Sequence, residues 1–362
     1  MRIFYYTAVD CSHPGGVQSV VGGLVEAMKR LGHHVFSTWS EPTGSRVANK
    51  TVLDLHLREP DRRRLWHLAS LFRSIGALLR TRPHIVHLHF LTKRAHYFLL
   101  LRRFLGFKVV ITAHGSDLLR PWPGDRDHLG RFLQEADAVT VVSEDLRDHA
   151  LRIGSLPQQR VEVIPNGVDM EVFQPIGGKR QPGSMRLISV GRLEHVKGHD
   201  VLLRALADPQ YGSGSCELTL VGDGEERSAL IELARQLAIE ARVNFAGMLN
   251  QQETLNLLQN SDVFVLPSRS EGLPVALIEA MACGLPCLAS DVGGVTQVLC
   301  GAGMTVEPDN PEELARCLGM ILADESLRTG LSKAAIRRAS SFSAALAANR
   351  YAALYKRLAS SG

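Results

Sequence analysis

The sequence lacks any uninterrupted run of about 20 apolar residues, the length that a helix needs to cross a bilayer. Its longest candidate, residues 98–111, is broken by Arg102, Arg103 and Lys108. The apolar stretch at the start, MRIFYYTA, is too short for the hydrophobic region of a secretory signal and favours a first buried β-strand. We therefore expect a cytoplasmic protein without a membrane-spanning segment.

Metal-binding patterns are also missing. The six cysteines form no C-x-x-C pair, and no cluster of Cys and His has the spacing of a zinc site, so free thiols in a reducing compartment are the simplest interpretation. A nominal D-x-D, Asp125-Arg126-Asp127, lies in a polar stretch flanked by Pro and Gly and not after an apolar strand. The sequence predicts no bound metal.

Two common nucleotide-binding signatures are absent as well. There is no Walker A sequence. The segment VGDGEER, residues 221–227, falls short of a full G-x-G-x-x-G and lacks an acidic ribose ligand. We expect neither a P-loop enzyme nor a dinucleotide-dependent one, and we expect no cofactor.

Charge is distributed unevenly along the chain. Residues 1–175 contain 23 Lys and Arg against 17 Asp and Glu, a net charge of +6, whereas the whole chain carries +4. A basic first half favours an anionic partner, such as phosphates or a membrane surface. Nucleic acid is not expected, because no interleaved aromatic residues or known reader motif accompany the charge.

Two basic, apolar segments have two possible interpretations. Residues 62–80 (RRRLWHLASLFRSIGALLR) and 96–108 (HYFLLLRRFLGFK) could form crossover helices whose apolar stripe faces the core. The same residues could contact anionic lipid peripherally. Both interpretations remain open at this point.

Short β-rich runs alternate with helical patterns throughout the chain. Six runs in the first half and six in the second read as strands: MRIFYYTA, HHVFSTW, HIVHLHF, KVVITAH, AVTVVS, VEVIP, RLISVGR, CELTLVGDG, RVNFAG, DVFVLPS, PCLASD and MTVEP. Such alternation predicts α/β folding with doubly wound parallel sheets. Because the Pro- and Gly-rich residues 173–185 interrupt it, we expect two Rossmann-like domains facing across a cleft.

These patterns set the expected domain boundaries. We expect a first domain over residues 1–172, a linker over 173–185 and a second domain over 186–340. Residues 341–362 show a helical pattern that no strand follows.

Residues 262–294 (DVFVLPSRSEGLPVALIEAMACGLPCLASDVGG) carry the most informative pattern. A buried strand leads through a polar loop containing Glu271 and Gly272 into a helix, with Pro274 expected in its first turn. Free amides at such a helix start form a phosphate site. We expect Glu279 about two turns inside the helix and about 12 Å from Glu271, a separation that suits a nucleotide sugar. Alternatively, Glu271 complements the helix dipole and Glu279 is a solvated surface residue.

The motif EGLPVALIEAMACGLP, residues 271–286, resembles the E-x7-E signature of retaining GT-B glycosyltransferases, especially family four. Other motifs follow in the order and spacing of that family, and together they cover most of the chain: PGG at 14–16, GHHV at 32–35, IPNGVD at 164–169, VGRLEHVKGHD at 190–200, VGDGEER at 221–227, FAG at 245–247 and GGVTQV at 293–298. The resemblance implies a GT-B fold and a metal-independent transfer of sugar from a nucleotide-sugar donor with retention, UDP-sugars being favoured.

The resemblance also implies where the donor binds. Arg192 and Lys197 are expected to hold the diphosphate, and fixed cations there would stabilise the charge that grows as the nucleotide leaves. Glu279 is expected to bind the ribose hydroxyls and Glu271 the donor sugar. Backbone groups are expected to contribute at five further positions: Gly16, Met248, Leu249, Gly272 and Leu273, with Pro274 beside them.

The resemblance places the acceptor side in the first domain. It also implies that the last helix, residues 341–362, crosses back onto that domain. The resemblance implies that His114, in VVITAHGSD, lies beside the reacting sugar. Asp117, Gln18 and Asn166 are weaker candidates for acceptor contacts. Two residues depart from the family pattern: Gln18 stands where an acidic residue is common, and Gln297 stands where GGxxE is common.

The implied acceptor is a sugar or a lipid-linked or polysaccharide precursor of the cell envelope. Two other functions remain as alternatives. A nucleotide-sugar epimerase of the same architecture would convert the donor without an acceptor. A nucleotide-sugar sensor would bind the donor without turnover, although it would not need the charged set around Arg192 and Lys197.

Overall fold

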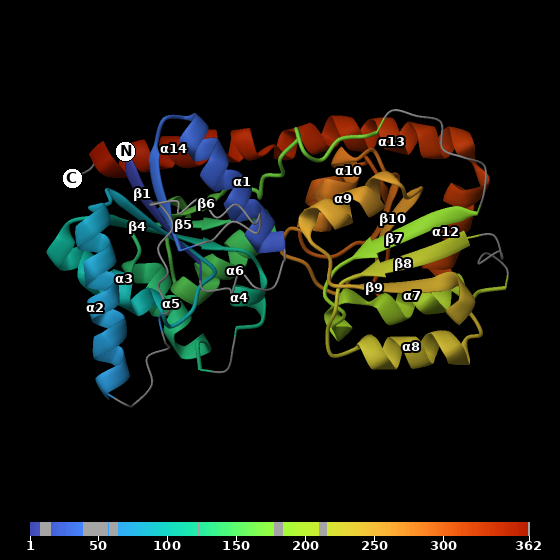
Figure 1. Cartoon of the computed structure of the whole chain (residues 1–362), viewed down its shortest axis with the longest axis horizontal. Helices are drawn as coiled ribbons and strands as arrows, with labels where there is room; N and C mark the ends of the chain where they lie inside the picture. Colours follow the sequence, from blue (N-terminus) through green and yellow to red (C-terminus); the bar gives the residue numbers. More distant parts are fainter. Residues whose placement is uncertain are drawn as a thin grey trace. The chain divides into compact units, whose positions relative to one another are not determined.

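The computed structural model describes residues 1–7, 16–38, 57, 64–121, 124–176, 184–209 and 216–360, without the side chains of 64–67. The chain divides into two compact units (Figure 1). The first comprises Met1–His13, Val17–Gly167 and Ala344–Gly362, and the second Pro14–Gly16 and Val168–Ser343. Cys11, Pro14, Gly15 and most of the expected linker lie outside the described residues.

The first unit is built on a six-stranded parallel sheet in the order β2-β1-β3-β4-β5-β6. Its strands are β1 Arg2–Thr7, β2 His34–Ser37, β3 Ile85–His89, β4 Lys108–Ala113, β5 Ala138–Val141 and β6 Val161–Val163. Its helices are α1 Gly16–Arg30, α2 Arg64–Thr81, α3 Ala95–Leu105, α4 Ser116–Leu119, α5 Arg126–Glu135, α6 Glu144–Gly154, the 3-10 turn η1 Gln158–Arg160 and the C-terminal α14 Ala344–Ser360.

The second unit has its own six-stranded parallel sheet, in the order β12-β11-β10-β7-β8-β9. Its strands are β7 Met185–Val190, β8 Cys216–Val221, β9 Val243–Gly247, β10 Val263–Leu266, β11 Cys287–Ser290 and β12 Met304–Val306. Its helices are α7 His199–Leu206, α8 Arg227–Gln236, α9 Gln251–Gln259, α10 Val275–Ala282, α11 Val295–Leu299, α12 Pro311–Ala323 and α13 Glu325–Ala339, with 3-10 turns η2 His195–Lys197, η3 Glu240–Arg242 and η4 Ser340–Phe342.

Strand order fixes where each sheet can bind a ligand. The expectation of two doubly wound parallel sheets is confirmed, and all twelve expected strands are present. In the second sheet the order reverses between β7 and β10, which pair with each other. In open α/β sheets, ligands bind beyond the carboxyl ends of the strands at such a reversal. The loops after β7 and β10 are therefore the favoured site in this unit.

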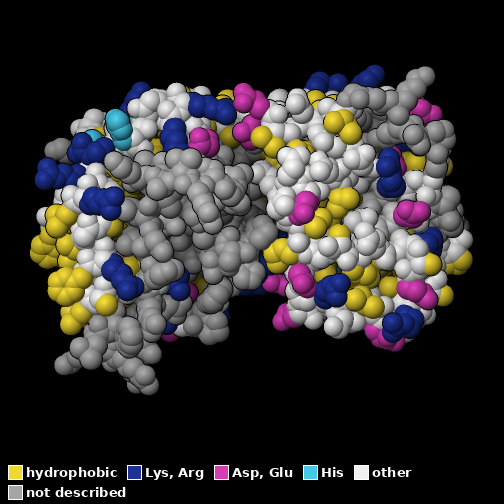
Figure 2. All heavy atoms as spheres, viewed as in Figure 1, with side chains coloured by type: hydrophobic (Ala, Val, Ile, Leu, Met, Phe, Trp, Pro, Cys, Tyr) yellow, Lys and Arg dark blue, Asp and Glu magenta, His cyan; other side chains and the backbone are white. Residues whose placement is uncertain are grey.

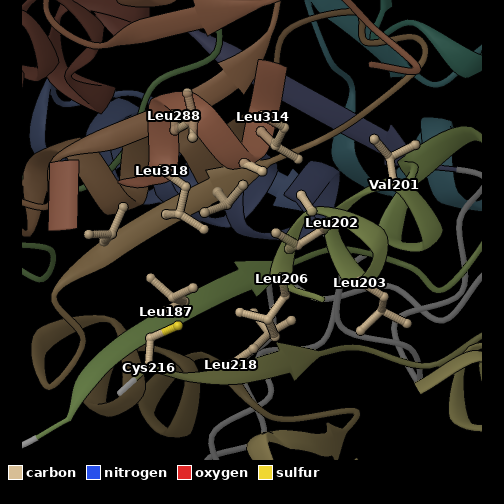
Figure 3. Packing of buried hydrophobic residues seen from close by; sticks show 14 of the residues in the cluster. Leu187, Val201, Leu202, Leu203, Leu206, Cys216, Leu218, Leu288, Leu314 and Leu318 are labelled. Carbon is tan, nitrogen blue, oxygen red and sulfur yellow. The ribbon is translucent and has the colours of Figure 1, made fainter. Parts of the chain in front are cut away.

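The second unit is held by a core of aliphatic side chains between its sheet and the helices on one face. Leu202, Leu203 and Leu206 of α7 pack with Leu314 and Leu318 of α12 and with residues of the sheet (Figure 3). Figure 1 shows α7 and α8 on one side of this sheet and α10 and α13 on the other. Full burial of each such side chain contributes about 1.5–3 kcal/mol, so this core holds the strand ends in place.

The first unit includes α14, which packs among its strands and α1. Tyr351, Tyr355 and Leu354 of α14 belong to the same buried cluster as Tyr5 and Leu24. The hydroxyl of Tyr355 lies 3.0 Å from the hydroxyl of Tyr5 and 2.6 Å from Nδ1 of His87. Tyr351 reaches Thr112, with 3.1 Å between the hydroxyls. The last helix is thus joined to the first unit by both apolar packing and buried hydrogen bonds.

Several features expected from composition can be located. In the part of the chain that the structure describes, Cys216, Cys283, Cys287 and Cys317 are buried and form no disulfide bond, and Cys300 is exposed. No helix within the described ranges is both long enough and apolar enough to cross a membrane. The described residues also contain no group of three or more His, Cys, Asp or Glu that could hold a metal ion.

Candidate active site

The loops after β7 and β10 bring together Lys197, Glu271 and Ser268. Lys197 Nζ donates a 2.7 Å hydrogen bond to Glu271 Oε1, and Ser268 Oγ donates to the same oxygen at 2.7 Å. Ser268 is fully buried, and the Glu271 side chain is only 8% exposed. The lysine side chain is 21% exposed, so this ion pair lies at the edge of the protein surface with its carboxylate inside. The sheet thus positions a cation and a carboxylate at its switch point.

Arg192 lies in the same loop as Lys197 but in a different environment. Its side chain is 63% exposed, and its guanidinium lies 2.6 Å from the carboxylate of Glu194. A surface ion pair of this kind contributes little stability, typically 0–1 kcal/mol. Breaking the ion pair with Glu194 therefore costs little free energy, so Arg192 can bind an incoming anion in its place.

Three glycines allow the loop after β10 to lie close to its neighbours. Gly198 and Gly293 have φ values of +64° and +51°. A Cβ at Gly198 would lie 2.0 Å from the Pro267 carbonyl oxygen, and one at Gly293 would lie 1.9 Å from that of Glu271. At Gly294 a Cβ would lie 2.3 Å from the Gly272 carbonyl oxygen. These positions need glycine because the backbone segments around Glu271 are in contact.

Arg269 stabilises this loop, a role that the sequence analysis did not identify. Its guanidinium donates two 2.8 Å hydrogen bonds to the carboxylate of Asp200, at the start of α7. It also pairs with Asp309. Burial acts to raise the pKa of Asp200, but hydrogen bonding and the charge of Arg269 lower it overall. The only indication of this role in the sequence was that a basic residue stands two positions before Glu271.

The helix after this loop starts later than the sequence analysis expected. α10 begins at Val275, and Pro274 is its N-cap, with φ −75° and ψ 105°, not a residue of the first turn. Glu279 is the fifth helical residue, so its expected place two turns inside was wrong. The 12 Å estimate treated all eight residues as helical, whereas the chain enters the helix only at Val275.

Glu279 is nevertheless not a solvated surface residue. It is only 8% exposed, and Gly272, Leu273 and Pro274 are buried as well. Burial raises the pKa of the Cys283 thiol to about 12, with a further contribution from the charge of Glu279. No side chain caps α10, so the amides of its first turn, which lack intrahelical acceptors, are suited to an anion.

The other expected donor residues lie at the ends of neighbouring elements. Met248 and Leu249 follow β9, and Met248 is 42% exposed. The loop then enters α9 through a capping box between Asn250 and Glu253. Gly16 is the exposed first residue of α1.

In the first unit, His114 follows β4 and contacts a second histidine. Its Nε2 lies 3.1 Å from Nδ1 of His89, at the end of β3. Both rings are buried, and they line a pocket together with Asn166 and Tyr351. Burial lowers the pKa of His114 to about 4, although an interaction with Asn166 acts in the opposite direction. The imidazole of His114 is therefore neutral at physiological pH.

His89 was missed by the sequence analysis. The run HIVHLHF contains histidines at alternate positions, and alternate residues of a strand share one face. His87 and His89 do lie together, with ring centroids 4.0 Å apart. That spacing was the signal that could have identified a buried histidine cluster beside His114.

Asp117 is engaged by the backbone. Its Oδ1 accepts hydrogen bonds from the amides of His114 and Gly115, at 3.0 and 2.9 Å, and its Oδ2 accepts one from Leu91 at 3.1 Å. Burial raises its pKa, and these hydrogen bonds oppose that rise. The carboxylate thus joins the loops after β3 and β4, which carry the two histidines.

The remaining acceptor-side candidates are also buried. Gln18 is 7% exposed on α1, and Asn166 is 5% exposed in the pocket that His89 and His114 line. The second departure from the family pattern, Gln297, lies in α11, where its carbonyl oxygen accepts a 2.6 Å hydrogen bond from Arg338.

Two family models match the chain. Residues 177–338 match Glycosyl transferases group 1, and residues 14–172 match Glycosyltransferase Family 4. Together the two ranges span most of the sequence and correspond to the two halves that the strand patterns separate.

One relative by sequence is a GDP-mannose-dependent monoacylated alpha-(1-6)-phosphatidylinositol monomannoside mannosyltransferase from Corynebacterium glutamicum. It is 29% identical over 249 residues, which cover 63% of this chain. The match spans 64% of that relative's length.

Solved structures share the fold. Sucrose-phosphate synthase from Thermosynechococcus elongatus has a TM-score of 0.83 at 23% identity, with all of both chains covered. Anabaena Alr3699/HepE in complex with UDP-glucose has a TM-score of 0.80 at 18% identity and covers 98% of this chain and 99% of its own. These similarities support the GT-B architecture.

Proposed function

Since the chain belongs to the family 4, group 1 type of GT-B glycosyltransferases, we propose that it moves a sugar from a nucleoside diphosphate sugar to a hydroxyl acceptor with retention at the anomeric carbon. The bond from the anomeric carbon to the diphosphate oxygen breaks, and a bond to the acceptor oxygen forms. The proton of the acceptor hydroxyl passes to the departing diphosphate oxygen, and the nucleoside diphosphate leaves. The observation that carries this proposal is the Lys197–Glu271 pair at the β7–β10 switch point.

We assign Lys197 and Arg192 to the donor diphosphate. Negative charge grows on the leaving diphosphate as the glycosidic bond breaks, so a cation fixed nearby stabilises the transition state more than the ground state. Lys197 is held by Glu271, and Arg192 is exposed enough to turn towards a ligand. These two cations and the start of α10 would neutralise the diphosphate without a divalent ion.

Two carboxylates divide the remaining donor contacts in this proposal. Glu271, whose Oε1 already accepts two hydrogen bonds, would orient a hydroxyl of the donor sugar. Glu279, buried on α10, would accept hydrogen bonds from the ribose. Backbone groups of Gly16, Met248, Leu249, Gly272 and Leu273, beside Pro274, would complete the donor site.

For the acceptor side, we propose that His114 lies beside the reacting sugar, with Gln18 and Asn166 near the acceptor. Its neutral imidazole can accept or donate a hydrogen bond through either nitrogen, according to the tautomer. Asp117 would act on the acceptor indirectly, by holding the backbone of His114 and Gly115.

The donor and acceptor are proposed by class. One relative is named for GDP-mannose, and one structural neighbour is bound to UDP-glucose; we favour a UDP-sugar, as the motifs suggested. The same relative is named for a monoacylated phosphatidylinositol monomannoside, which supports a lipid-linked or cell-envelope precursor as acceptor of this chain. We propose that it meets this acceptor at the cytoplasmic face of a membrane. The epimerase and sensor alternatives are not favoured, because the matched models and relatives are transferases.

A donor screen with product analysis tests this function. The protein is incubated with UDP-, GDP- and ADP-sugars, with and without lipid extracts, and products are identified by mass spectrometry and anomeric NMR coupling. We expect one nucleotide class to raise the melting temperature and an α-linked product to form from an α-linked donor. Conversion of the donor to a new sugar nucleotide without acceptor would support the epimerase and overturn the proposal.

A further inference from the structure

The helix α2 buries its small polar residues and exposes three of its large apolar ones. Ser70, Ser74 and Thr81 are at most 3% exposed. Ser74 Oγ donates to the Ser70 carbonyl at 2.9 Å, and Thr81 Oγ1 donates to that of Ala77 at 2.8 Å. These bonds to the preceding turn satisfy the hydroxyls, so that face can pack inward.

The opposite face of α2 is apolar and exposed. Leu68, Phe72 and Leu79 are 49%, 68% and 55% exposed, and their spacing places them along one stripe of the helix. The interpretation of the whole apolar stripe as an inward face was therefore wrong for these residues, although Ala77 and Leu78 are buried.

The neighbouring helix α3, which packs against α2, adds to this surface. Leu100 is 40% exposed and Phe104 78%, one turn apart. Figure 2 shows apolar side chains gathered at one end of the first unit, with basic side chains around them. We refer to Leu68, Phe72, Leu79, Leu100 and Phe104 as the α2–α3 face.

The charged side chains of α2 and α3 themselves are all basic. Arg73, Arg80 and Arg103 are exposed on the same two helices. Neither α2 nor α3 contains an Asp or Glu. An anionic bilayer has an apolar interior beneath negatively charged head groups. Exposed apolar side chains that share their helices with exposed arginines complement such a surface.

We propose that the α2–α3 face docks on an anionic lipid surface. Phe72 and Phe104 would enter the boundary between head groups and acyl chains, while Arg73, Arg80 and Arg103 bind lipid phosphates. A second copy of this chain fits less well, because a two-fold contact places the same patch against itself and brings arginines together. The proposal is independent of which sugar is transferred.

Vesicle flotation with the full chain tests the docking. Phosphatidylcholine vesicles with and without phosphatidylglycerol are used at low and high salt. Wild-type protein is expected to float with the anionic vesicles, and much less at high salt, because salt screens the arginine contacts. Phe72→Ser/Phe104→Ser and Arg80→Glu/Arg103→Glu are each expected to weaken vesicle affinity by about tenfold or more.

Matched controls lie on exposed positions of the second unit. Met320→Ser/Ile336→Ser removes apolar side chains that are 46% and 40% exposed, and Lys333→Glu/Arg337→Glu reverses two exposed charges. Both are expected to float like wild type. All variants should bind free nucleotide with wild-type affinity, so failure of docking can be distinguished from failure of the proposed transfer.

Three results would overturn the proposal. Wild-type protein that does not float with anionic vesicles at low salt is the first. Equal loss of flotation in the control variants is the second. The third is a dimer in gel filtration that only the α2–α3 variants dissociate, which would assign the face to a second copy of the chain.

Discussion

Lys197 Nζ and Glu271 Oε1 lie 2.7 Å apart although 74 residues separate them in sequence. The pair joins the loop after β7 to the loop after β10, and the hydroxyl of Ser268 completes the hydrogen bonding of the shared oxygen. Without a ligand, the charge of Lys197 is thus partly neutralised by Glu271. A bound diphosphate would compete with Glu271 for this cation.

Removing the charge of Glu271 should separate donor binding from turnover. In Glu271→Gln the lysine loses its carboxylate partner, so free nucleoside diphosphate is expected to bind at least as tightly as in wild type. The orienting contact to the donor sugar is weakened, and kcat/KM is expected to fall about 10–150-fold, as for a charged hydrogen bond of about 1.5–3 kcal/mol. Calorimetry and steady-state kinetics measure the two effects. Nucleotide affinity that falls together with kcat/KM would contradict this division of roles.

Glu279 should contribute to nucleotide affinity. The proposed charged hydrogen bond to the ribose is worth about 1.5–3 kcal/mol, so Glu279→Ala should weaken free nucleotide about 10–150-fold. Glu312→Gln, an exposed carboxylate in the first turn of α12, serves as the control and should bind normally. A folded Glu279→Ala protein with wild-type affinity would remove this residue from the donor site.

The buried neutral His114 should make the protein less stable in acid. Its pKa is about 4 in the folded state against 6.5 for the free side chain, so below pH 6.5 the unfolded chain takes up a proton that the native state does not. Stability is therefore expected to decrease as pH falls from about 6.5 towards 4. Between pH 7 and 5 this site accounts for about 2 kcal/mol.

Denaturant unfolding of wild type and His114→Gln at both pH values checks this expectation. The variant, which cannot titrate at this position, should lose about 2 kcal/mol less stability between pH 7 and 5 than wild type does. Identical losses in the two proteins would show that His114 is not held neutral.

Activity should not need a divalent metal ion. The proposed diphosphate site uses Lys197, Arg192 and the start of α10 in place of one. Transfer measured after dialysis against EDTA should keep most of its rate. Complete loss of activity, with recovery on adding Mn²⁺, would contradict the proposed mechanism.

Local patterns in the sequence predicted the secondary structure well. They did not predict which residues, distant in sequence, contact each other in the site. Strands such as β7 and β10 are short apolar runs bounded by polar or Gly-rich turns, so their existence follows from local pattern. The partner of Lys197 could not be inferred in this way, because it depends on which loops the strand order brings together. The family resemblance predicted that Lys197 and Glu271 share one donor site, but it did not show that the two side chains bind each other.

Two differences between expectation and structure have specific physical causes. Pro274 was expected in the first helical turn and Glu279 two turns inside, but the helix begins only after Pro274, whose extended ψ separates loop from helix. In α2, periodicity indicated a helix without showing that Ser74 and Thr81 could pack inward by bonding to the preceding turn. Apolar spacing alone therefore left open whether Phe72 faces the core or the solvent, and in the structure this side chain is 68% exposed.

The role of Lys197 and Arg192 in stabilising the leaving group is the central claim, and it is tested by donor kinetics. Arg192→Ala, Lys197→Ala and the double variant are compared with Lys333→Ala, an exposed lysine on α13, each with its folding checked. Arg192→Lys is included because a lysine cannot bind two phosphate oxygens in the fork of a guanidinium and should not restore full activity. The two losses should combine less than additively, because both cations act on one leaving group.

The most direct measurement is kcat at saturating donor for Lys197→Ala. Loss of one comparable electrostatic donor costs other enzymes about 100–1,000-fold in kcat, and we expect a decrease of that order with a smaller change in the donor KM. The fall in kcat reports charge that develops only as the glycosidic bond breaks. A raised KM with kcat unchanged would show that Lys197 only anchors the donor, and the leaving-group role assigned to it would be wrong.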